Sequence, residues 1–264
     1  MVKVTGMKIA TWNVAGIRAR HDTLIKWLKW CEPDIVCLQE TKTIDANFPR
    51  TEIEALGYHI EAHGQKGFNG VALLSKTSPD EVVRGLPGDD SDEQARYIEA
   101  VYSTQKGVIR VASLYVPNGN PVDSEKYPYK LRWYERFQKH AASLLALEEP
   151  LVFAGDYNVI GSDYDAKNPQ EWIGDALYLP QSRQALWGIR NLGFYDAIRS
   201  TSDNPDYSFW DFKSGAWTKN DGIRIDHFLI SPEAADKLES SSVQSVVRGW
   251  EKPSDHVPVV IKLK

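Results

Sequence analysis

The sequence predicts a single α/β domain with mixed sheets, and three observations support this prediction. Short apolar runs alternate with amphipathic stretches along the chain. Several apolar runs follow one another with no helical stretch between them, which favours antiparallel pairing beside parallel pairing. No Gly/Ser-rich linker divides the 264 residues, and no repeat of about 20–50 residues is evident. We expect one domain over residues 7–264, preceded by a short extension over residues 1–6.

The composition is that of an ordinary globular chain, with 42% hydrophobic and 25% charged residues. A net charge of −5 argues against a general nucleic-acid binder, but not against an enzyme whose acidic site has basic rims. Cys31 and Cys37 lack the spacing of a metal site and indicate a reducing compartment. No apolar run approaches about 18 residues, and no signal peptide is evident. We expect a cytoplasmic monomer with no membrane partner.

The first predicted strand, residues 7–13, ends in the amide side chain of Asn13. An amphipathic helix follows, because apolar residues recur at helical spacing at Leu24, Trp27, Leu28 and Cys31. Pro33 ends this helix, and residues 35–38 form a short buried strand. Glu40 comes directly after that strand and is exposed at the end of a sheet. A solvated loop residue is the alternative for Glu40 taken alone.

Two hairpins are expected in the middle of the chain, over residues 58–75 and 96–114. The first has a glycine-rich connection that could meet a phosphate through backbone amides, although a plain loop is favoured. The second turns at Lys106-Gly107 and leads into Tyr115. Residues 124–147 form the longest predicted helix, with an apolar stripe at Leu131, Tyr134, Phe137, Ala141, Leu144 and Leu145.

A buried strand over residues 151–154 leads to Asp156 and Asn158. If the strand geometry continues, these two side chains point to the same side of the sheet. A carboxylate can accept a proton or hold a metal, and an amide can position an oxyanion. The alternative for this motif taken alone is an Asx turn that closes the strand.

The second half of the chain carries further polar side chains at strand ends. An irregular polar-aromatic loop spans residues 163–179. The remaining predicted elements are a helix over 184–192 and strands over 194–198, 224–230, 243–247 and 257–261. Asp226 lies in one of these strands, and the pair Asp255-His256 directly precedes the last one.

Eight polar residues share a position at or next to a predicted strand end: Asn13, Glu40, Tyr115, Asp156, Asn158, Asp226, Asp255 and His256. If these ends meet at one rim, the oxygen-rich set suits Mg²⁺ or Mn²⁺ better than a zinc ion with sulfur ligands. A hard cation beside a base is what phosphodiester hydrolysis needs. We expect the other histidines to be surface or packing residues: His21, His59, His63, His140 and His227.

The ordered set of motifs resembles the exonuclease III family of apurinic/apyrimidinic endonucleases, within the wider endonuclease/exonuclease/phosphatase fold. The motifs lie at residues 11–14, 38–42, 70–75, 115–118, 155–158, 224–226 and 254–256. The resemblance implies a four-layer α/β sandwich, with two mixed β-sheets packed face to face and helices outside. It also implies Mg²⁺-dependent cleavage of double-stranded DNA 5′ to abasic sites, leaving a 3′-hydroxyl, and action on blocked 3′ ends. Mn²⁺ is expected to substitute for Mg²⁺.

The resemblance also implies a role for each matching residue. Glu40 is the expected principal metal ligand, helped by Asn13 and Asp255, and Asp156 is either the base that activates water or a second metal ligand. The whole expected metal set is Asn13, Glu40, Asp156, Asn158, Asp255 and His256. Asn158 also steadies the water, and Asp226 orients His256 toward the phosphate. Tyr115 contacts the phosphate or acts as a phenolate, and Asn118 supports the phosphate clamp.

Substrate recognition is expected from two further groups. Phe209, Ile223 and Ile225 match a pocket that holds a flipped-out abasic sugar. The expected DNA backbone contacts are Lys42, Lys66, Lys213, Lys219 and Arg224. Two departures from the family pattern are Ala15, which implies a missing outer ligand, and Ile223, which implies a looser pocket. A phosphoesterase that acts on RNA or another phosphodiester, and a DNA-binding module without activity, are the alternatives.

Overall fold

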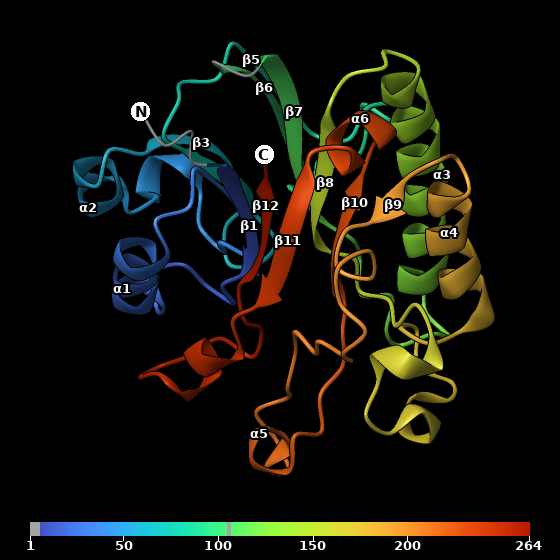
Figure 1. Ribbon diagram of the computed structural model, residues 1–264. Helices are drawn as coiled ribbons and strands as arrows, with labels where there is room; N and C mark the ends of the chain where they lie inside the picture. The colour runs from blue at the N-terminus through green and yellow to red at the C-terminus, as the bar shows by residue number, and fades with distance from the viewer. Residues whose placement is uncertain (1–5, 105–106) are drawn as a thin grey trace.

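The computed structural model describes residues 6–104 and 107–264. Two β-sheets pack face to face between outer helices, with α1 and α2 outside one sheet and α3 and α4 outside the other (Figure 1). The first sheet has the order β11-β12-β1-β2-β4-β3 and the second β5-β6-β7-β8-β10-β9. Each sheet contains one parallel pair, β1 with β2 and β7 with β8, beside antiparallel pairs. The predicted four-layer sandwich with mixed sheets is confirmed.

The elements have the following bounds within the described residues. The first sheet contains β1 (Met7–Asn13), β2 (Ile35–Gln39), β3 (His59–His63), β4 (Val71–Ser75), β11 (Leu238–Val243) and β12 (Val259–Leu263). The second contains β5 (Glu81–Arg84), β6 (Tyr97–Thr104), β7 (Gly107–Tyr115), β8 (Leu151–Asp156), β9 (Tyr195–Asp196) and β10 (Asp226–Ile230). The helices are α1 (His21–Cys31), α2 (Arg50–Ala55), α3 (Lys126–Leu145), α4 (Pro180–Arg190), α5 (Ala216–Lys219) and α6 (Pro232–Ala235).

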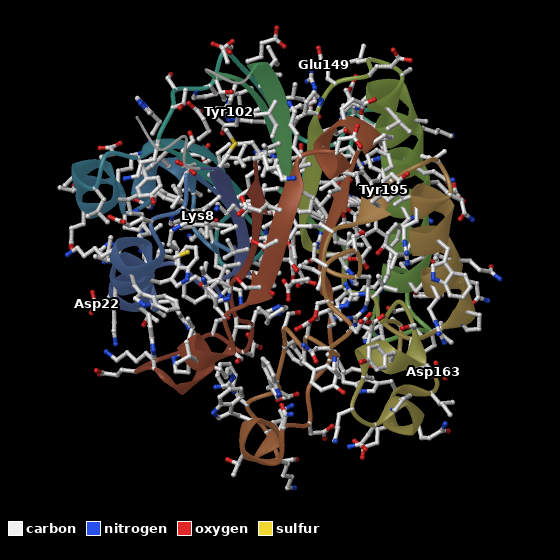
Figure 2. All side chains as sticks on the ribbon, in the orientation of Figure 1. Lys8, Asp22, Tyr102, Glu149, Asp163 and Tyr195 are labelled. Carbon is white, nitrogen blue, oxygen red and sulfur yellow. The ribbon has the colours of Figure 1, made fainter. Side chains whose placement is uncertain are left out.

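Strand alternation divides the core into three apolar layers. In β1, Ile9 faces the other sheet, whereas Ala10 and Trp12 face α1. The central layer joins the two sheets, and a third layer packs α3 and α4 on the second sheet through contacts such as Phe137 with Phe153. Full burial of a side chain of this size contributes roughly 1.5–3 kcal/mol. Charged side chains such as Asp22 and Asp163 lie at the periphery (Figure 2).

Helix α1 follows its predicted pattern. Leu24, Trp27 and Leu28 are buried, and Glu32 ends the helix in the left-handed conformation with φ 48°. Leu38 continues this apolar layer from β2. None of the described helices combines the length and apolar content needed to cross a bilayer.

The strand predicted over residues 243–247 is wrong. Strand β11 ends at Val243, and residues 245–249 form a 3₁₀ helix. The side chain of Gln244 accepts a hydrogen bond from Trp27 Nε1 at 2.5 Å, and its backbone N–H bonds the carbonyl of Pro258. Gln244 therefore anchors the chain where it leaves β11.

Two predictions concern residues outside the described ranges. Of the expected extension over residues 1–6, residues 1–5 lie outside the described residues. Residues 105–106, where the second hairpin was expected to turn, also lie outside them, although Thr104 pairs with Gly107 as that hairpin requires. The first hairpin is confirmed by antiparallel pairing of β3 with β4.

Strand direction explains why distant residues meet at one rim. The parallel strands β1 and β2 end at the same edge of their sheet, and β12 runs against β1 and therefore begins there. The second sheet repeats this arrangement, because β7 and β8 end where the antiparallel β10 begins. The side chains expected at these ends are consequently brought together between the two sheets.

Candidate active site

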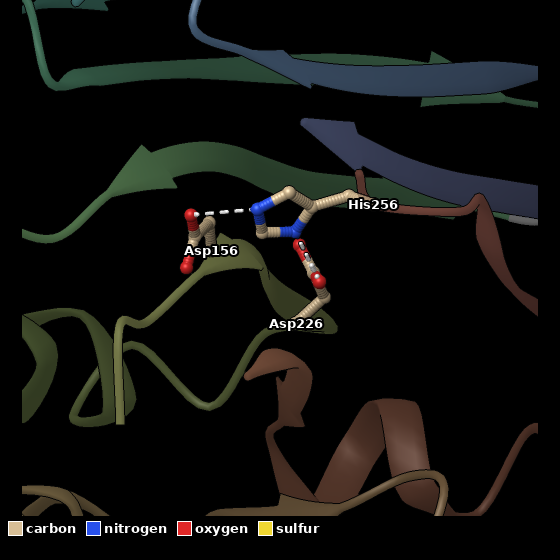
Figure 3. A group of neighbouring side chains, drawn as sticks. All are labelled: Asp156, Asp226 and His256. Carbon is tan, nitrogen blue, oxygen red and sulfur yellow. Dashed lines mark hydrogen bonds and ion pairs between the residues drawn. The ribbon is translucent and has the colours of Figure 1, made fainter. Parts of the chain in front are cut away.

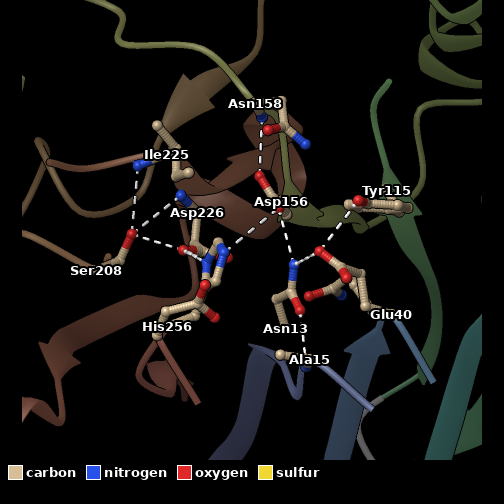
Figure 4. Close-up of polar contacts among 12 residues, drawn as sticks. Asn13, Ala15, Glu40, Tyr115, Asp156, Asn158, Ser208, Ile225, Asp226 and His256 are labelled. Carbon is tan, nitrogen blue, oxygen red and sulfur yellow. Dashed lines mark hydrogen bonds and ion pairs between the residues drawn. The ribbon is translucent and has the colours of Figure 1, made fainter. Parts of the chain in front are cut away.

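Asn13 connects carboxylates that come from different sheets (Figure 4). Its Nδ2 donates to Glu40 Oε1 at 2.9 Å and to Asp156 Oδ2 at 3.0 Å. Its Oδ1 accepts the backbone N–H of Ala15 at 3.0 Å. In this orientation Asn13 holds the two carboxylates together. Its role as a metal ligand stays a prediction, because that role requires the amide to turn over.

Glu40 lies at the bend that follows β2, in the left-handed conformation with φ 51°. Lys42 Nζ lies 2.7 Å from Glu40 Oε2, and the hydroxyl of Tyr115 donates to Oε1 at 3.0 Å. Burial acts to raise the pKa of Glu40, but hydrogen bonds from Asn13 and Lys42 outweigh burial and lower this pKa. Glu40 is therefore a carboxylate at neutral pH and can hold a cation.

Asp156, Asp226 and His256 form a buried trio (Figure 3). His256 Nδ1 lies 2.7 Å from Asp226 Oδ2, and His256 Nε2 lies 3.7 Å from Asp156 Oδ2. Burial acts to lower the pKa of His256, but Asp226 and Asp156 raise it to about 10. Burial raises the pKa of Asp156 to about 7, against the attraction of His256. The imidazole is therefore a cation at neutral pH, and Asp156 can exchange a proton there.

The loop after β8 differs from an extended strand. The strand ends at Asp156, and Asn158 has φ 46° and donates its backbone N–H to Asp156 Oδ1 at 2.9 Å. The strand geometry therefore does not continue to Asn158, and the Asx turn considered as the alternative closes the strand. Asn158 Oδ1 accepts from Asn118 Nδ2 at 3.0 Å, and Asn158 Nδ2 donates to the carbonyl of Val116 at 2.8 Å.

Three residues that the sequence analysis did not select hold this trio in place. Ser208 Oγ donates to Asp226 Oδ2 at 2.6 Å. Ser254 Oγ donates to the carbonyl of Asn13 at 2.7 Å, and Trp12 Nε1 donates to the carbonyl of His256 at 3.1 Å. Ser254 and Trp12 lie inside recognised motifs and could have been selected. Ser208 lies outside the recognised motifs and carries no comparable signal.

A fourth missed residue is a cation. The guanidinium of Arg96 lies 4.9 Å from the ring centroid of Tyr115 and is half-buried.

Asp255, an expected metal ligand, accepts a hydrogen bond from Ser254 Oγ at 3.2 Å and is half-exposed. Its role as a ligand stays a prediction.

The residues expected to recognise an abasic sugar form an apolar cluster beside the trio. Ile223 and Ile225 are buried, and half-buried Phe209 packs against them. Phe209 also forms a backbone bridge with His256, and the two rings lie 4.9 Å apart. Their role in substrate binding stays a prediction, but their position next to the imidazole agrees with it.

The expectation that Arg224 contacts the DNA backbone is corrected by its position. Arg224 is buried, with Nε 2.7 Å from Asp165 Oδ1 and Nη2 3.0 Å from Asp196 Oδ2. A guanidinium whose donors are used by two buried carboxylates is not available to a phosphate. The other expected DNA contacts are available: Lys66, Lys213 and Lys219 are exposed, whereas Lys42 pairs with Glu40.

The donor set fits a hard divalent cation. One oxygen of Asp156, one oxygen of Asp226 and one nitrogen of His256 all lie within 4.8 Å of one another, but the protonated imidazole has no lone pair for a metal, so the carboxylates are the candidate ligands. Glu40 adds a carboxylate linked to Asp156 through Asn13. Asp226 Oδ1 is buried and has no hydrogen-bond partner among the described residues. Oxygen ligands without sulfur favour Mg²⁺, Mn²⁺ or Ca²⁺ over a structural zinc ion.

Comparison of the sequence and comparison of the structure with known proteins point to one family. Residues 10–256 match the endonuclease/exonuclease/phosphatase family. The chain is 35% identical to exodeoxyribonuclease III of Haemophilus influenzae, over 98% of this chain and 100% of the relative. It superposes on an AP endonuclease from Archaeoglobus fulgidus with a TM-score of 0.92 at 36% identity, covering 98% and 99% of the two chains. For the 3′-5′ exonuclease NExo of Neisseria meningitidis the TM-score is 0.93 at 33% identity, covering 98% and 100%. The protein is therefore an enzyme of the endonuclease/exonuclease/phosphatase family.

Proposed function

We propose that this protein is a Mg²⁺-dependent DNA repair phosphodiesterase that cleaves the backbone 5′ to abasic sites and leaves a 3′-hydroxyl. We include 3′→5′ exonuclease action and removal of 3′ blocking groups, with double-stranded DNA as the partner and a monomer as the active form. The observation that carries the proposal is the single rim where the imidazolium of His256, the carboxylate of Asp156 and the apolar Phe209 cluster meet. The names of the relatives support a DNA substrate, since one NExo structure is a 3′ phosphatase bound to a product DNA hairpin.

The principal metal-binding residue in this proposal is Glu40, with Asp255 as a further carboxylate, and Asp156 is kept as the base. A bound Mg²⁺ supplies Lewis-acid stabilisation of the negative charge on the phosphate and the leaving oxygen. Mn²⁺ satisfies the same oxygen ligands and is expected to substitute.

His256 is the proposed anchor for the phosphate. Its cationic form pairs electrostatically with a phosphate oxygen, and Asp226 fixes the ring through Nδ1 at 2.7 Å. Asp156 accepts the proton of the attacking water, because burial places its pKa at about 7. Burial and the charge of Glu40 raise the pKa of Tyr115 well above its ordinary value. In this proposal Tyr115 therefore acts as a neutral donor, the form that suits its expected contact with the phosphate.

The Phe209 cluster supports a preference for abasic substrates. A sugar without a base is easier to extrude from the helix, because no stacking or pairing has to be broken. The apolar surface of Phe209, Ile223 and Ile225 would receive this sugar beside His256. The exposed Lys66, Lys213 and Lys219 provide sequence-independent contacts with phosphates.

The proposal is tested with a labelled duplex that carries one central tetrahydrofuran residue. We expect a single nick on its 5′ side with Mg²⁺, and no nick in excess EDTA. A second duplex with a 3′-phosphate tests end cleaning. Faster turnover of RNA or another phosphodiester would instead favour the alternative phosphoesterase. If the protein bound the abasic duplex but cleaved it with none of the divalent ions tried, the proposed endonuclease activity would be rejected.

A further inference from the structure

Lys130 is fully buried on α3, and its ammonium contacts both loops that carry the site asparagines. Its Nζ donates to the carbonyls of Asn158 at 2.6 Å, Asn118 at 3.0 Å and Ala176 at 3.1 Å. An ammonium group has three N–H donors, so these three carbonyls use all of them. All three acceptors are neutral backbone groups, so the charge is buried without a directly bonded carboxylate, and this burial lowers the pKa of Lys130 to about 7. The three carbonyls stabilise the protonated form, which alone has three donors.

The surrounding chain is shaped to admit this lysine. Gly119 has φ +93°, and a Cβ at this position would lie 2.8 Å from Lys130 Cδ. Any residue other than glycine would therefore collide with the lysine stem. Burying a charge is costly unless its hydrogen bonds are satisfied. A neutral apolar side chain at position 130 would avoid this cost but would donate no hydrogen bonds. The property that the ammonium adds is its set of three donors.

Three donors that diverge from one atom can fix three separate segments relative to one another. The fixed segments are the turn after β7, the loop after β8, and the loop around Ala176. Side-chain bonds reinforce the first two, because Asn118 Nδ2 donates to Asn158 Oδ1 at 3.0 Å. Asn158 in turn bonds Asp156 Oδ1 through its backbone N–H at 2.9 Å. A continuous chain of contacts therefore runs from Lys130 through Asn158 to Asp156.

We propose that Lys130 is a positioning residue for the reaction, which fixes Asn118 and Asn158 relative to Asp156. This inference rests on the proposed function because Lys130 is taken to position residues of the proposed active site. Lys130 reaches the site through backbone carbonyls, and its effect must therefore pass through Asn158 and Asn118. Such a residue affects the geometry of the reacting groups more than it affects substrate affinity.

The test compares Lys130→Met with the control Tyr58→Phe. Methionine keeps an unbranched apolar stem as far as Cε but removes the ammonium and with it every donor. Tyr58→Phe removes a different buried bond, from the Tyr58 hydroxyl to the carbonyl of Pro33 at 2.7 Å, outside the site. We expect Lys130→Met to lower kcat at least 30-fold with KM within threefold of the parent. Tyr58→Phe should keep kcat within twofold. A Lys130→Met enzyme with parental kcat would overturn the proposal.

A double-mutant cycle separates positioning from general loss of stability. If Lys130 acts through Asn158, adding Lys130→Met to Asn158→Ala should slow the enzyme no more than threefold further. Fully additive losses would reject this route. Lys130→Gln, which retains two donors, replaces the methionine variant if that variant does not fold.

Hydrogen exchange gives a readout that does not depend on the substrate. Lys130→Met should accelerate exchange of the amides of residues 157–160, whereas Tyr58→Phe should not. Unchanged exchange there would overturn the proposal even if no substrate were known. Failure of the parent enzyme on the abasic duplex would reject the proposed function alone, and the kinetic comparison would then use the phosphoester that the parent hydrolyses fastest.

Discussion

At the scale of single residues, Asp156 is held by three partners in the site. Its two oxygens contact Asn13, the backbone of Asn158 and, at 3.7 Å, the imidazole of His256. The sequence analysis left open whether Asp156 is the base or a second metal ligand. Burial raises its pKa to about 7, so the free side chain can accept a proton near neutral pH, which favours the role of base.

Replacing Asp156 by Asn should abolish most of the activity. The amide has the same shape but cannot accept a proton, so we expect kcat to fall about 10²–10⁴-fold while KM for the abasic duplex changes little. Steady-state kinetics with saturating Mg²⁺ measure both constants. Asp163→Asn, at an exposed carboxylate, is the control and should retain parental activity. A fully active Asp156→Asn enzyme would contradict the assigned role.

Single residues also show where prediction from sequence reaches its limit. Glu40, Asp156 and His256 could be selected because each stands at the end of an apolar run, and strand direction then brings them together. Arg224 has the same appearance in the sequence as a surface arginine. Only the fold reveals Asp165 and Asp196 on either side of it, because both carboxylates come from distant segments. Long-range partners of this kind leave no local pattern.

At the scale of elements, the buried ion pairs of Arg224 join β9, the segment just before β10 and the 3₁₀ helix over residues 163–165. Removing one member of such a group leaves the others charged and buried. We expect Arg224→Met to lower the free energy of unfolding by about 3–5 kcal/mol, measured by urea denaturation. Because the side chain is not exposed, the salt dependence of KM should not change.

Lys213→Met is the matched comparison for Arg224→Met. Lys213 is exposed, so its removal should leave stability nearly unchanged and weaken the salt dependence of KM. The opposite pattern, with Arg224 controlling the salt dependence, would restore the original expectation of a DNA contact.

The same elements predict a loss of stability in acid. Burial and the nearby Arg224 lower the pKa of His227 from its ordinary 6.5 to about 4. Between pH 6.5 and pH 4 the imidazole is protonated in the unfolded chain but neutral in the folded chain. The stabilisation of the folded state by neutral His227 is therefore complete above pH 6.5 and is lost as the pH falls to 4. The loss amounts to on the order of 3 kcal/mol. Despite their burial, Asp165 and Asp196 have lowered pKa values because of Arg224, and they extend the loss below pH 4.

Urea denaturation between pH 7.5 and pH 4 measures this effect. His227→Gln cannot titrate, so its unfolding free energy should vary less over this interval than that of the parent. Parallel pH profiles for the two proteins would show that His227 is not responsible.

The two strands that the sequence analysis missed share one physical reason. Strands β5 and β11 lie at sheet edges, and their residues are mostly exposed or half-buried. The sequence of β11, Leu-Glu-Ser-Ser-Ser-Val, has neither an apolar run nor strict alternation. Its pairing with β12 decides its conformation, and pairing partners are a property of the fold. The buried strands could be predicted because burial on both faces requires apolar residues throughout.

At the scale of the whole molecule, the two sheets bring acidic groups together. Glu40 belongs to the first sheet, whereas Asp156 and Asp226 belong to the second. A divalent cation that binds the folded protein but not the unfolded chain should raise the unfolding temperature. We expect Mg²⁺ to raise this temperature in calorimetry and EDTA to abolish nicking without loss of the circular dichroism spectrum. A Glu40→Gln variant should show a smaller rise, and a rise equal to that of the parent would contradict the assigned ligand.

Strand β12 lies between β11 and β1 although it is synthesised last of the strands in the described residues. A chain still being made on the ribosome lacks both the imidazole of His256 and the neighbour that β1 requires. The first sheet therefore closes only when translation has passed residue 263, and hydrolytic competence arrives with that closure. A chain that ends before residue 259 therefore lacks β12 as the neighbour of β1, and one that ends before residue 256 also lacks the imidazole of the site.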